Sequence, residues 1–302
     1  MPYPYPYQHA MLERLQAAKR PGVFLDQLGE TPGGHTLTVI RLEPPDPATA
    51  PAERPTILAY AREHGTEPEG SWVVEGMLRW LLSDDPDAVT ARQQYDWLLI
   101  PLLDPDDAGR CRYTSANIFS NAAPVRPEAV AYATYLVHRI DTGRRLELVI
   151  NLHNVECTEG PNLFTPLVNR LRQPAIAELN APLWPAAREA GFTVGQPAWS
   201  MVGLANERLS GWCFQHFRTM DLFYEVNGRA PASRLTPGRL RQLGAVLARQ
   251  SSAMMRSPVM AAVRADITEH LAARTRTRAD YWQTQGRTAQ TRTTGDLLVL
   301  GY

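Results

Sequence analysis

The chain has 302 residues, 44% of them hydrophobic, and its 31 Lys and Arg residues are balanced by 31 Asp and Glu residues. This length and apolar content fit a globular protein built as a single α/β unit. The lack of net charge and of any apolar run long enough for a membrane helix argues against nucleic-acid-binding and membrane proteins.

The first part of the chain is expected to contain an arm, a helix and a strand. The Pro-Tyr repeat within residues 1–8 predicts an extended arm, because proline does not fit a helix interior. Residues 8–19 have the apolar spacing of a helix, and residues 35–42 alternate as a strand does. The arm has no basic region followed by an apolar run, so it is no secretion signal, and we expect a cytoplasmic protein.

Four short and almost wholly apolar segments have the pattern of buried parallel strands. They are residues 56–60, 96–102, 146–152 and 220–226. Helical spacing lies between and after them, in residues 71–82, 127–140 and 236–255. The alternation predicts an α/β sandwich with a largely parallel sheet, whose functional site forms at the carboxyl ends of the strands.

The predicted elements end near residue 256, so residues 1–256 are expected to form one domain. Residues 257–302 are rich in Arg and Thr and are predicted to be a C-terminal extension with no assigned role. Nothing indicates that disulfides or a cysteine metal site stabilise the domain, because the three cysteines are widely spaced and form no CxxC pair. They are Cys111, Cys157 and Cys213.

Three side chains at strand ends form a candidate zinc site. His64 and Glu67 lie three residues apart on a turn after the first apolar strand, and His153 ends the third. Two imidazoles and one carboxylate are a ligand set that catalytic zinc uses, and Gly65 would let the turn bend. An exposed His-Glu pair and a structural His153 are the alternative interpretations, and His216 is kept as a reserve ligand.

Glu225 is the candidate catalytic residue. It lies near the end of the fourth apolar strand, where a carboxylate is costly to bury unless it has a function or a partner. Next to a water activated by the metal, it would act as the general base. The alternative is a structural ion pair with Arg218 or Arg229.

The order of these segments resembles that of the M14 zinc carboxypeptidases. Residues 28–34 are similar to the family's entry motif, residues 64–70 to H-G-x-E-x-x-G, and residues 100–106 to P-x-x-N-P-D-G, with Asp104 in place of Asn. His153 and Glu225 occupy the places of the third ligand and the catalytic glutamate.

The resemblance, which covers residues 27–250, makes residues 1–256 the catalytic domain. It implies a three-layer α/β/α sandwich around a mixed, mostly parallel sheet of about eight strands. It also implies one zinc ion per chain and hydrolysis of a peptide or amide bond, with a peptide or small amide as the partner and no nucleic acid or membrane.

The substrate clamp of the family has only a partial match. Arg112 matches the family's first arginine and is expected to polarise the carbonyl and bind substrate. Asn117 and Asn121 are candidate substrate-binding residues, but residues 113–121 contain no arginine to complete the family's Asn-Arg pair. Three other arginines are alternatives for the missing charge: Arg110, Arg126 and Arg208.

Two other functions stay open. The spacing between the second and third candidate ligands is short, 153 − 67 = 86 residues. In this respect the chain also resembles enzymes of the aspartoacylase and succinylglutamate desuccinylase type. Such an enzyme would hydrolyse N-acyl amino acids. The incomplete clamp also allows a catalytically inactive relative that binds without hydrolysis.

Overall fold

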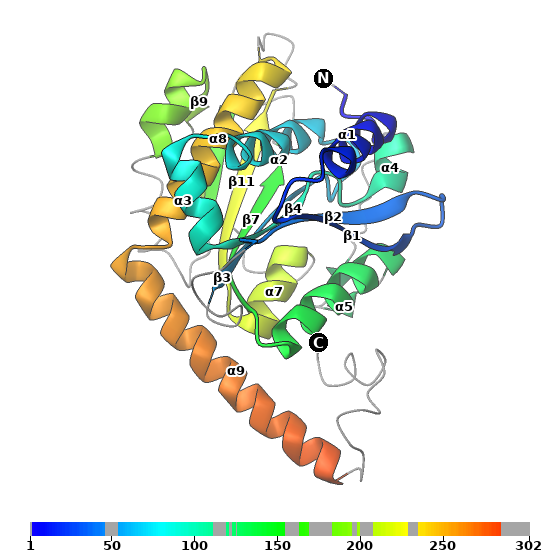
Figure 1. Cartoon of the computed structure of the whole chain (residues 1–302), viewed down its shortest axis with the longest axis vertical. Coiled ribbons are helices and arrows are strands. Elements are labelled where there is room, and N and C mark those ends of the chain that lie inside the picture. Colours follow the sequence, from blue (N-terminus) through cyan, green and yellow to red (C-terminus); the bar gives the residue numbers. More distant parts are fainter. Residues whose placement is uncertain are drawn as a thin grey trace.

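The computed structural model describes residues 2–45, 54–110, 119–120, 123–124, 126–154, 163–168, 183–194, 198–199, 208–228 and 235–284. Helices and strands alternate along this part of the chain (Figure 1). The helices are α1 (Tyr5–Ala18), α2 (Pro68–Leu81), α3 (Pro86–Gln94), α4 (Pro105–Arg110), α5 (Pro127–Asp141), α7 (Leu209–Phe217), α8 (Pro237–Met254) and α9 (Pro258–Thr284). The strands are β1 (Val23–Glu30), β2 (Thr36–Leu42), β3 (Pro55–Ala61), β4 (Asp96–Ile100), β5 (Phe119–Ser120), β6 (Ala123–Pro124), β7 (Arg145–His153), β8 (Leu163–Val168), β9 (Thr193–Val194), β10 (Ala198–Trp199) and β11 (Met220–Asn227).

One mixed sheet organises the described residues. Its order is β1-β2-β4-β3-β7-β11-β8-β10, and β9 pairs with β8, which makes nine strands where about eight are predicted. The four central strands β4, β3, β7 and β11 are parallel to one another, whereas β1 and β2 on one side and β8 on the other add antiparallel pairs. The prediction of an α/β fold with a mixed, mostly parallel sheet is confirmed.

Helices cover both faces of the sheet (Figure 1). Along β3, Ile57 and Ala59 belong to the core cluster that contains α2 and α8, while Leu58 and Tyr60 belong to the cluster that contains α5 and α7. This alternation follows from the two-residue period of a strand. Two separate hydrophobic cores on one sheet make the three-layer sandwich that the resemblance implies.

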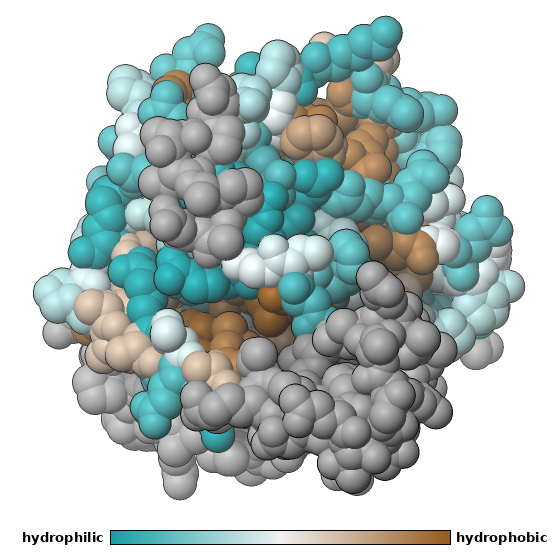
Figure 2. Space-filling model, turned by 60° about the horizontal axis from the view of Figure 1, so that its bottom comes forward, coloured by the Kyte–Doolittle hydropathy of each residue, from teal (hydrophilic) through white to brown (hydrophobic). Residues whose placement is uncertain are grey.

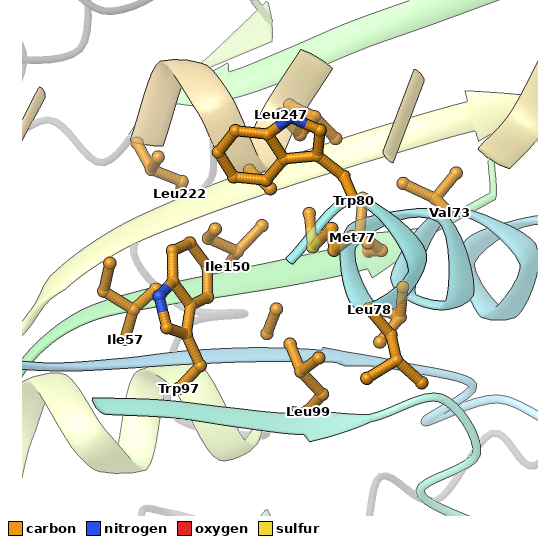
Figure 3. Close-up of a cluster of buried hydrophobic side chains, with 14 of the residues drawn as sticks. Ile57, Val73, Met77, Leu78, Trp80, Trp97, Leu99, Ile150, Leu222 and Leu247 are labelled. Atoms are coloured by element: carbon orange, nitrogen blue, oxygen red, sulfur yellow. The ribbon is translucent and has the colours of Figure 1, made fainter. Parts of the chain in front are cut away.

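The larger core lies between the sheet and helices α2 and α8. Figure 3 shows Trp97 and Ile150 from the sheet facing Met77 of α2 and Leu247 of α8. Helix α2 is buried on nearly all sides because it lies between the sheet and α8. Its position matters for function, since α2 begins directly after the loop that carries His64 and Glu67.

The N-terminal segment is packed rather than free. Pro4 is extended, but α1 begins at Tyr5, earlier than predicted, because a proline is compatible with the first turn of a helix. Tyr3 is fully buried, and its ring meets that of Trp72 edge-on at 4.7 Å. The extended arm predicted for residues 1–8 is therefore wrong beyond residue 4.

The start of the predicted C-terminal extension also belongs to the packed structure. Helix α9 is the long helix at the lower end of Figure 1, and it begins two residues after the predicted boundary. Met260, Val263 and Ile267 on its first turns are buried in the larger core. A division of the chain at residue 256 stays a prediction, but these turns contribute to the core.

The surface agrees with the balanced composition. On the face drawn in Figure 2, apolar patches are separated by hydrophilic residues. Among the described residues Phe24 is the large apolar side chain that is exposed, at 43%, and the guanidinium of Arg41 lies 4.1 Å from its ring centre. No helix in the described ranges has the length and hydropathy needed to span a membrane.

Candidate metal centre

The loop between β3 and α2 carries His64 and Glu67. The loop is held by Arg62, whose Nε donates to the carbonyl oxygen of Gly65 at 2.8 Å. A side chain at Gly65 would clash with the backbone of Asp107. Glycine is therefore required because the loop approaches α4 closely. The sequence suggested that Gly65 is needed for a sharp bend, but its φ is not positive.

Two neighbouring parallel strands provide the other residues. His153 is the last residue of β7, Glu225 lies near the end of β11, and these two residues are directly opposite each other in the β7–β11 ladder. Strand β3 is the neighbour of β7 on its other side, and it ends just before the His64 loop. The carboxyl ends of three adjacent strands thus bring the four candidate residues to one edge of the sheet.

His64, Glu67 and His153 form a compact group. One potential ligand atom from each lies within 4.8 Å of the others. Oε1 of Glu67 is 2.8 Å from Nδ1 of His64, and its Oε2 is 2.9 Å from Nδ1 of His153. The three residues are only 2%, 5% and 1% exposed, respectively. Both imidazoles present Nδ1 to the same carboxylate.

The charges of this group stabilise one another. Burial alone would raise the pKa of Glu67, but the nearby imidazoles of His153 and His64 outweigh it and lower that pKa to about 2. Burial alone would lower the pKa of His153, but Glu67 and Glu63 raise it to about 9. An ionised carboxylate is therefore ready to ligate a cation, whereas His153 must release a proton first.

Glu225 lies beside the group without a structural partner. Burial raises its pKa to about 7, and the charge of Glu67 adds to this effect while that of His153 opposes it. Its buried Oε2 has no hydrogen-bond partner, and Glu225 forms no ion pair with a described residue. The alternative pairing with Arg218 is not observed, because Arg218 lies over the ring of Phe214 at 5.4 Å; Arg229 lies outside the described residues.

The donor set fits zinc. Two imidazole nitrogens and one carboxylate are the protein ligands of a catalytic zinc site, which leaves a position for water or substrate. Oε2 of Glu67 is buried and accepts no well-aligned hydrogen bond, although it lies close to His153. The reserve candidate His216 is in the last turn of α7, where its ring packs on Trp212, and it does not belong to the group.

The predicted substrate-binding residues Arg112, Asn117 and Asn121 lie outside the residues that the structure describes. Of the alternative arginines, Arg126 is in ion pairs with three carboxylates, which are those of Asp104, Asp107 and Glu128. Arg208, at the start of α7, lies over the ring of Phe223 at 4.6 Å. Its charge acts on both His153 and Glu225, so it is nearer to the group than Arg126.

Sequence reasoning missed Glu63 and Phe223. Glu63 is buried next to His153, and the ring of Phe223 stacks on that of His153 at 4.8 Å with an interplanar angle of 12°. The position of Glu63, directly before His64 at the end of an apolar strand, was a signal that could have revealed it.

Comparisons with known proteins agree with this geometry. A family model described as zinc carboxypeptidase matches residues 8–115. The chain is 35% identical over 116 residues to cytosolic carboxypeptidase 1 of Danio rerio, which covers 34% of this chain and 10% of that protein. It is 28% identical over 173 residues to cytosolic carboxypeptidase 1 of Gallus gallus, and this match covers 49% of this chain and 14% of that protein. The chain thus spans a small part of these curated relatives.

Solved structures extend the likeness to most of the chain. The metallo-carboxypeptidase of Burkholderia cenocepacia is 20% identical with a TM-score of 0.67, and the match covers 84% of this chain and 70% of that one. A metallo-carboxypeptidase of Pseudomonas aeruginosa is 17% identical with a TM-score of 0.64, covering 84% and 69%. At these identities the likeness establishes the fold. The chain is thus similar to M14 zinc carboxypeptidases in sequence over residues 8–115 and in fold over most of its length.

Proposed function

We propose that the protein is a zinc-dependent hydrolase that cleaves a peptide or amide bond in the manner of a carboxypeptidase. One zinc ion per chain is bound by His64, Glu67 and His153. The observation that carries this proposal is the convergence of three buried donor atoms within 4.8 Å, with Glu225 opposite His153 on the next strand.

Each residue has a distinct role in this proposal. His64, Glu67 and His153 would hold the zinc ion, which would supply polarisation of the scissile carbonyl and activation of water. Glu225 takes a proton from the attacking water and gives it to the leaving nitrogen. A raised pKa supports this role, because a base with a pKa near 7 can both accept and release a proton at neutral pH. Arg112 polarises the carbonyl and binds the substrate together with Asn117 and Asn121.

Substrate class and location follow from the family. The substrate is a peptide or a small amide, and no nucleic acid or membrane takes part. We place the protein in the cytoplasm, in keeping with the relatives that are named cytosolic carboxypeptidases. Residues 1–256 form the catalytic domain, and residues 257–302 follow it.

Elemental analysis of the purified protein tests the metal. We expect about one zinc ion per chain in the wild type and none in His64→Ala, because removal of one of three ligands opens the site. His9→Ala is the matched control, since His9 is an exposed histidine on α1 and its loss should leave the zinc content unchanged. A wild type that binds no zinc after zinc is added back would refute the proposal.

A substrate panel separates the candidate activities. Peptides with free and with amidated C-termini are compared with N-acyl amino acids, using the zinc-loaded protein. Release of a C-terminal residue from the free peptides alone supports the carboxypeptidase. Turnover of only the N-acyl amino acids favours the aspartoacylase type, and zinc binding without any turnover favours the inactive relative.

A further inference from the structure

A second carboxylate lies near the candidate ligand His153, at the ring nitrogen that does not face Glu67. Oε2 of Glu63 lies 3.4 Å from Nε2 of His153, and both side chains are almost completely buried. This distance is at the long end for a hydrogen bond. The contact is not a well-aligned hydrogen bond, and Nε2 forms none with any described residue, so the Glu63 carboxylate is the acceptor that lies near this buried nitrogen.

The carboxylate of Glu63 is itself held in place by α7. The backbone N–H of Leu209 donates to its Oε1 at 3.1 Å, and the hydroxyl of Tyr60 donates to its Oε2 at 3.3 Å. The same hydroxyl accepts the N–H of Ser210 at 3.0 Å. These N–H groups belong to the first turn of the helix, which needs acceptors and favours a negative charge.

The ring of His153 has little freedom to turn. One face stacks on Phe223 at 4.8 Å. Its Nδ1 lies 2.9 Å from Oε2 of Glu67, and its Nε2 lies 3.4 Å from Oε2 of Glu63. A neutral imidazole carries one proton, and it can ligate a metal only through the nitrogen that lacks it. An acceptor fixed at Nε2 therefore leaves Nδ1 free for the metal.

We propose that Glu63, held by Tyr60 and the first turn of α7, is a positioning residue that keeps the proton of His153 on Nε2 and directs Nδ1 to the metal. The inference rests on the proposed zinc site and assigns a role to a residue outside the ligand set. Partners of this kind to metal-binding histidines commonly contribute 10- to 100-fold in metal affinity.

The variant Glu63→Gln tests the idea at nearly constant shape. A glutamine can still accept the N–H of Leu209 through its oxygen, but it then presents its NH₂ group to His153. A donor at that position favours the tautomer with the proton on Nδ1, which cannot ligate the metal. We expect the zinc dissociation constant, measured by competition with a chelator, to rise about 10- to 100-fold.

Tyr60→Phe is the matched control. It removes one hydrogen bond to Glu63 and the acceptor of Ser210, but leaves the carboxylate and its charge next to His153. We expect a lower stability and a loss of zinc affinity well below that of Glu63→Gln, because the carboxylate remains next to His153 and is still held by the N–H of Leu209. If Glu63 only caps α7, the two variants should change stability and zinc affinity alike, and that result would overturn the proposal.

Nitrogen NMR of the ¹⁵N-histidine-labelled, zinc-loaded wild type gives an independent readout. We expect the His153 ring to carry an exchange-protected proton on Nε2 and the metal on Nδ1. This measurement decides the question even if Glu63→Gln fails to fold, since a metal on Nε2 or an unprotected proton would refute the role of Glu63. A wild type without zinc affinity would instead refute the proposed function itself.

Discussion

Glu225 differs from Glu67 and Glu63 because it forms no ion pair with a described residue. Glu67 faces two imidazoles and Glu63 caps α7, whereas the buried Oε2 of Glu225 neither pairs with a cation nor accepts a hydrogen bond among the described residues. Such a group is kept ready for a proton or a substrate at the cost of some stability. We therefore expect the proposed chemistry to depend on Glu225 more than the fold does.

Glu225→Gln should abolish most activity and leave the metal in place. Glutamine has nearly the same shape but cannot accept the proton of the attacking water, so we expect kcat to fall by about 10²- to 10⁴-fold. Zinc content and the free energy of unfolding should stay close to wild type. Glu13→Gln, at an exposed glutamate of α1, is the control that should retain full activity. An active, zinc-loaded Glu225→Gln protein would exclude Glu225 as the base.

The same residue determines the expected pH dependence. Burial raises the pKa of Glu225 to about 7, and a bound cation shifts it downward because it favours the ionised form. The proposed base is active when ionised. The value of kcat/KM should therefore decrease as the pH drops through a value at or below about 7, where Glu225 takes up one proton. The profile is measured at saturating zinc, with zinc content checked at each pH. Activity that increases as the pH falls below that value would contradict this assignment.

At the level of single residues, the sequence reveals only two kinds of group. They are polar residues that would be costly to bury and residues whose spacing places them at strand ends. His64, Glu67 and His153 could be found because strand ends of a parallel sheet meet at one edge. The supporting roles of Tyr60 and Ser210 could not, since a contact between residues 150 positions apart depends on where α7 packs. Local spacing carries no information about such a contact.

The contact between α2 and α8 is the element-scale feature most sensitive to substitution. A β-carbon at Gly76 would clash with the backbone of Arg241, and one at Gly244 would clash with the carbonyl of Val73. Two glycines therefore let the backbones of these helices approach closely. Because α2 begins at the loop that carries the candidate ligands His64 and Glu67, this contact also helps to position them.

Gly244→Ala should destabilise the protein although alanine has the higher helix propensity. The added methyl group must push the helices apart, so we expect a loss of about 2 kcal/mol or more in the free energy of unfolding. Gly238→Ala is the control in the same helix, because its β-carbon would meet only Oγ1 of Thr236 at an ordinary 3.5 Å. That variant should be neutral or more stable by up to about 1 kcal/mol. Denaturant unfolding of both variants checks this, and equal effects would contradict the close contact.

The predicted elements agree best with the structure where one face is strongly apolar. The strands predicted at residues 56–60, 146–152 and 220–226 correspond to β3, β7 and β11, with ends that differ by at most one residue. Helix α3 was not predicted because only Ala88 and Ala91 of its residues are buried, which gives no apolar stripe. Helix α7 was not predicted because it is short and apolar on several sides, so its pattern has no helical period.

At the scale of the whole molecule, the C-terminal boundary decides how many residues the proposed catalytic domain requires to fold stably. A boundary at residue 256 follows from composition, since the following segment is rich in Arg and Thr. Composition cannot reveal that the first turns of α9 return apolar side chains to the core. Arg264 on the same turns pairs with the buried Glu147 of β7 at 2.6 Å, which ties the helix to the central sheet.

A chain that ends at Arg256 should therefore be much less stable than one that ends at Ala273. The shorter chain loses Met260, Val263 and Ile267 from the core, and at about 1.5–3 kcal/mol for each buried side chain the loss is on the order of 5 kcal/mol. For a protein of this size that corresponds to a decrease in Tm of roughly 10 °C or more. The longer chain keeps all three side chains and the pair with Glu147, so its Tm should stay within a few degrees of that of the full chain. Thermal unfolding of the three chains decides between the two boundaries. If the shorter chain is as stable as the full chain, α9 is a separate extension, as its composition suggests. The expected loss of stability would instead make the first turns of α9 part of the proposed catalytic domain.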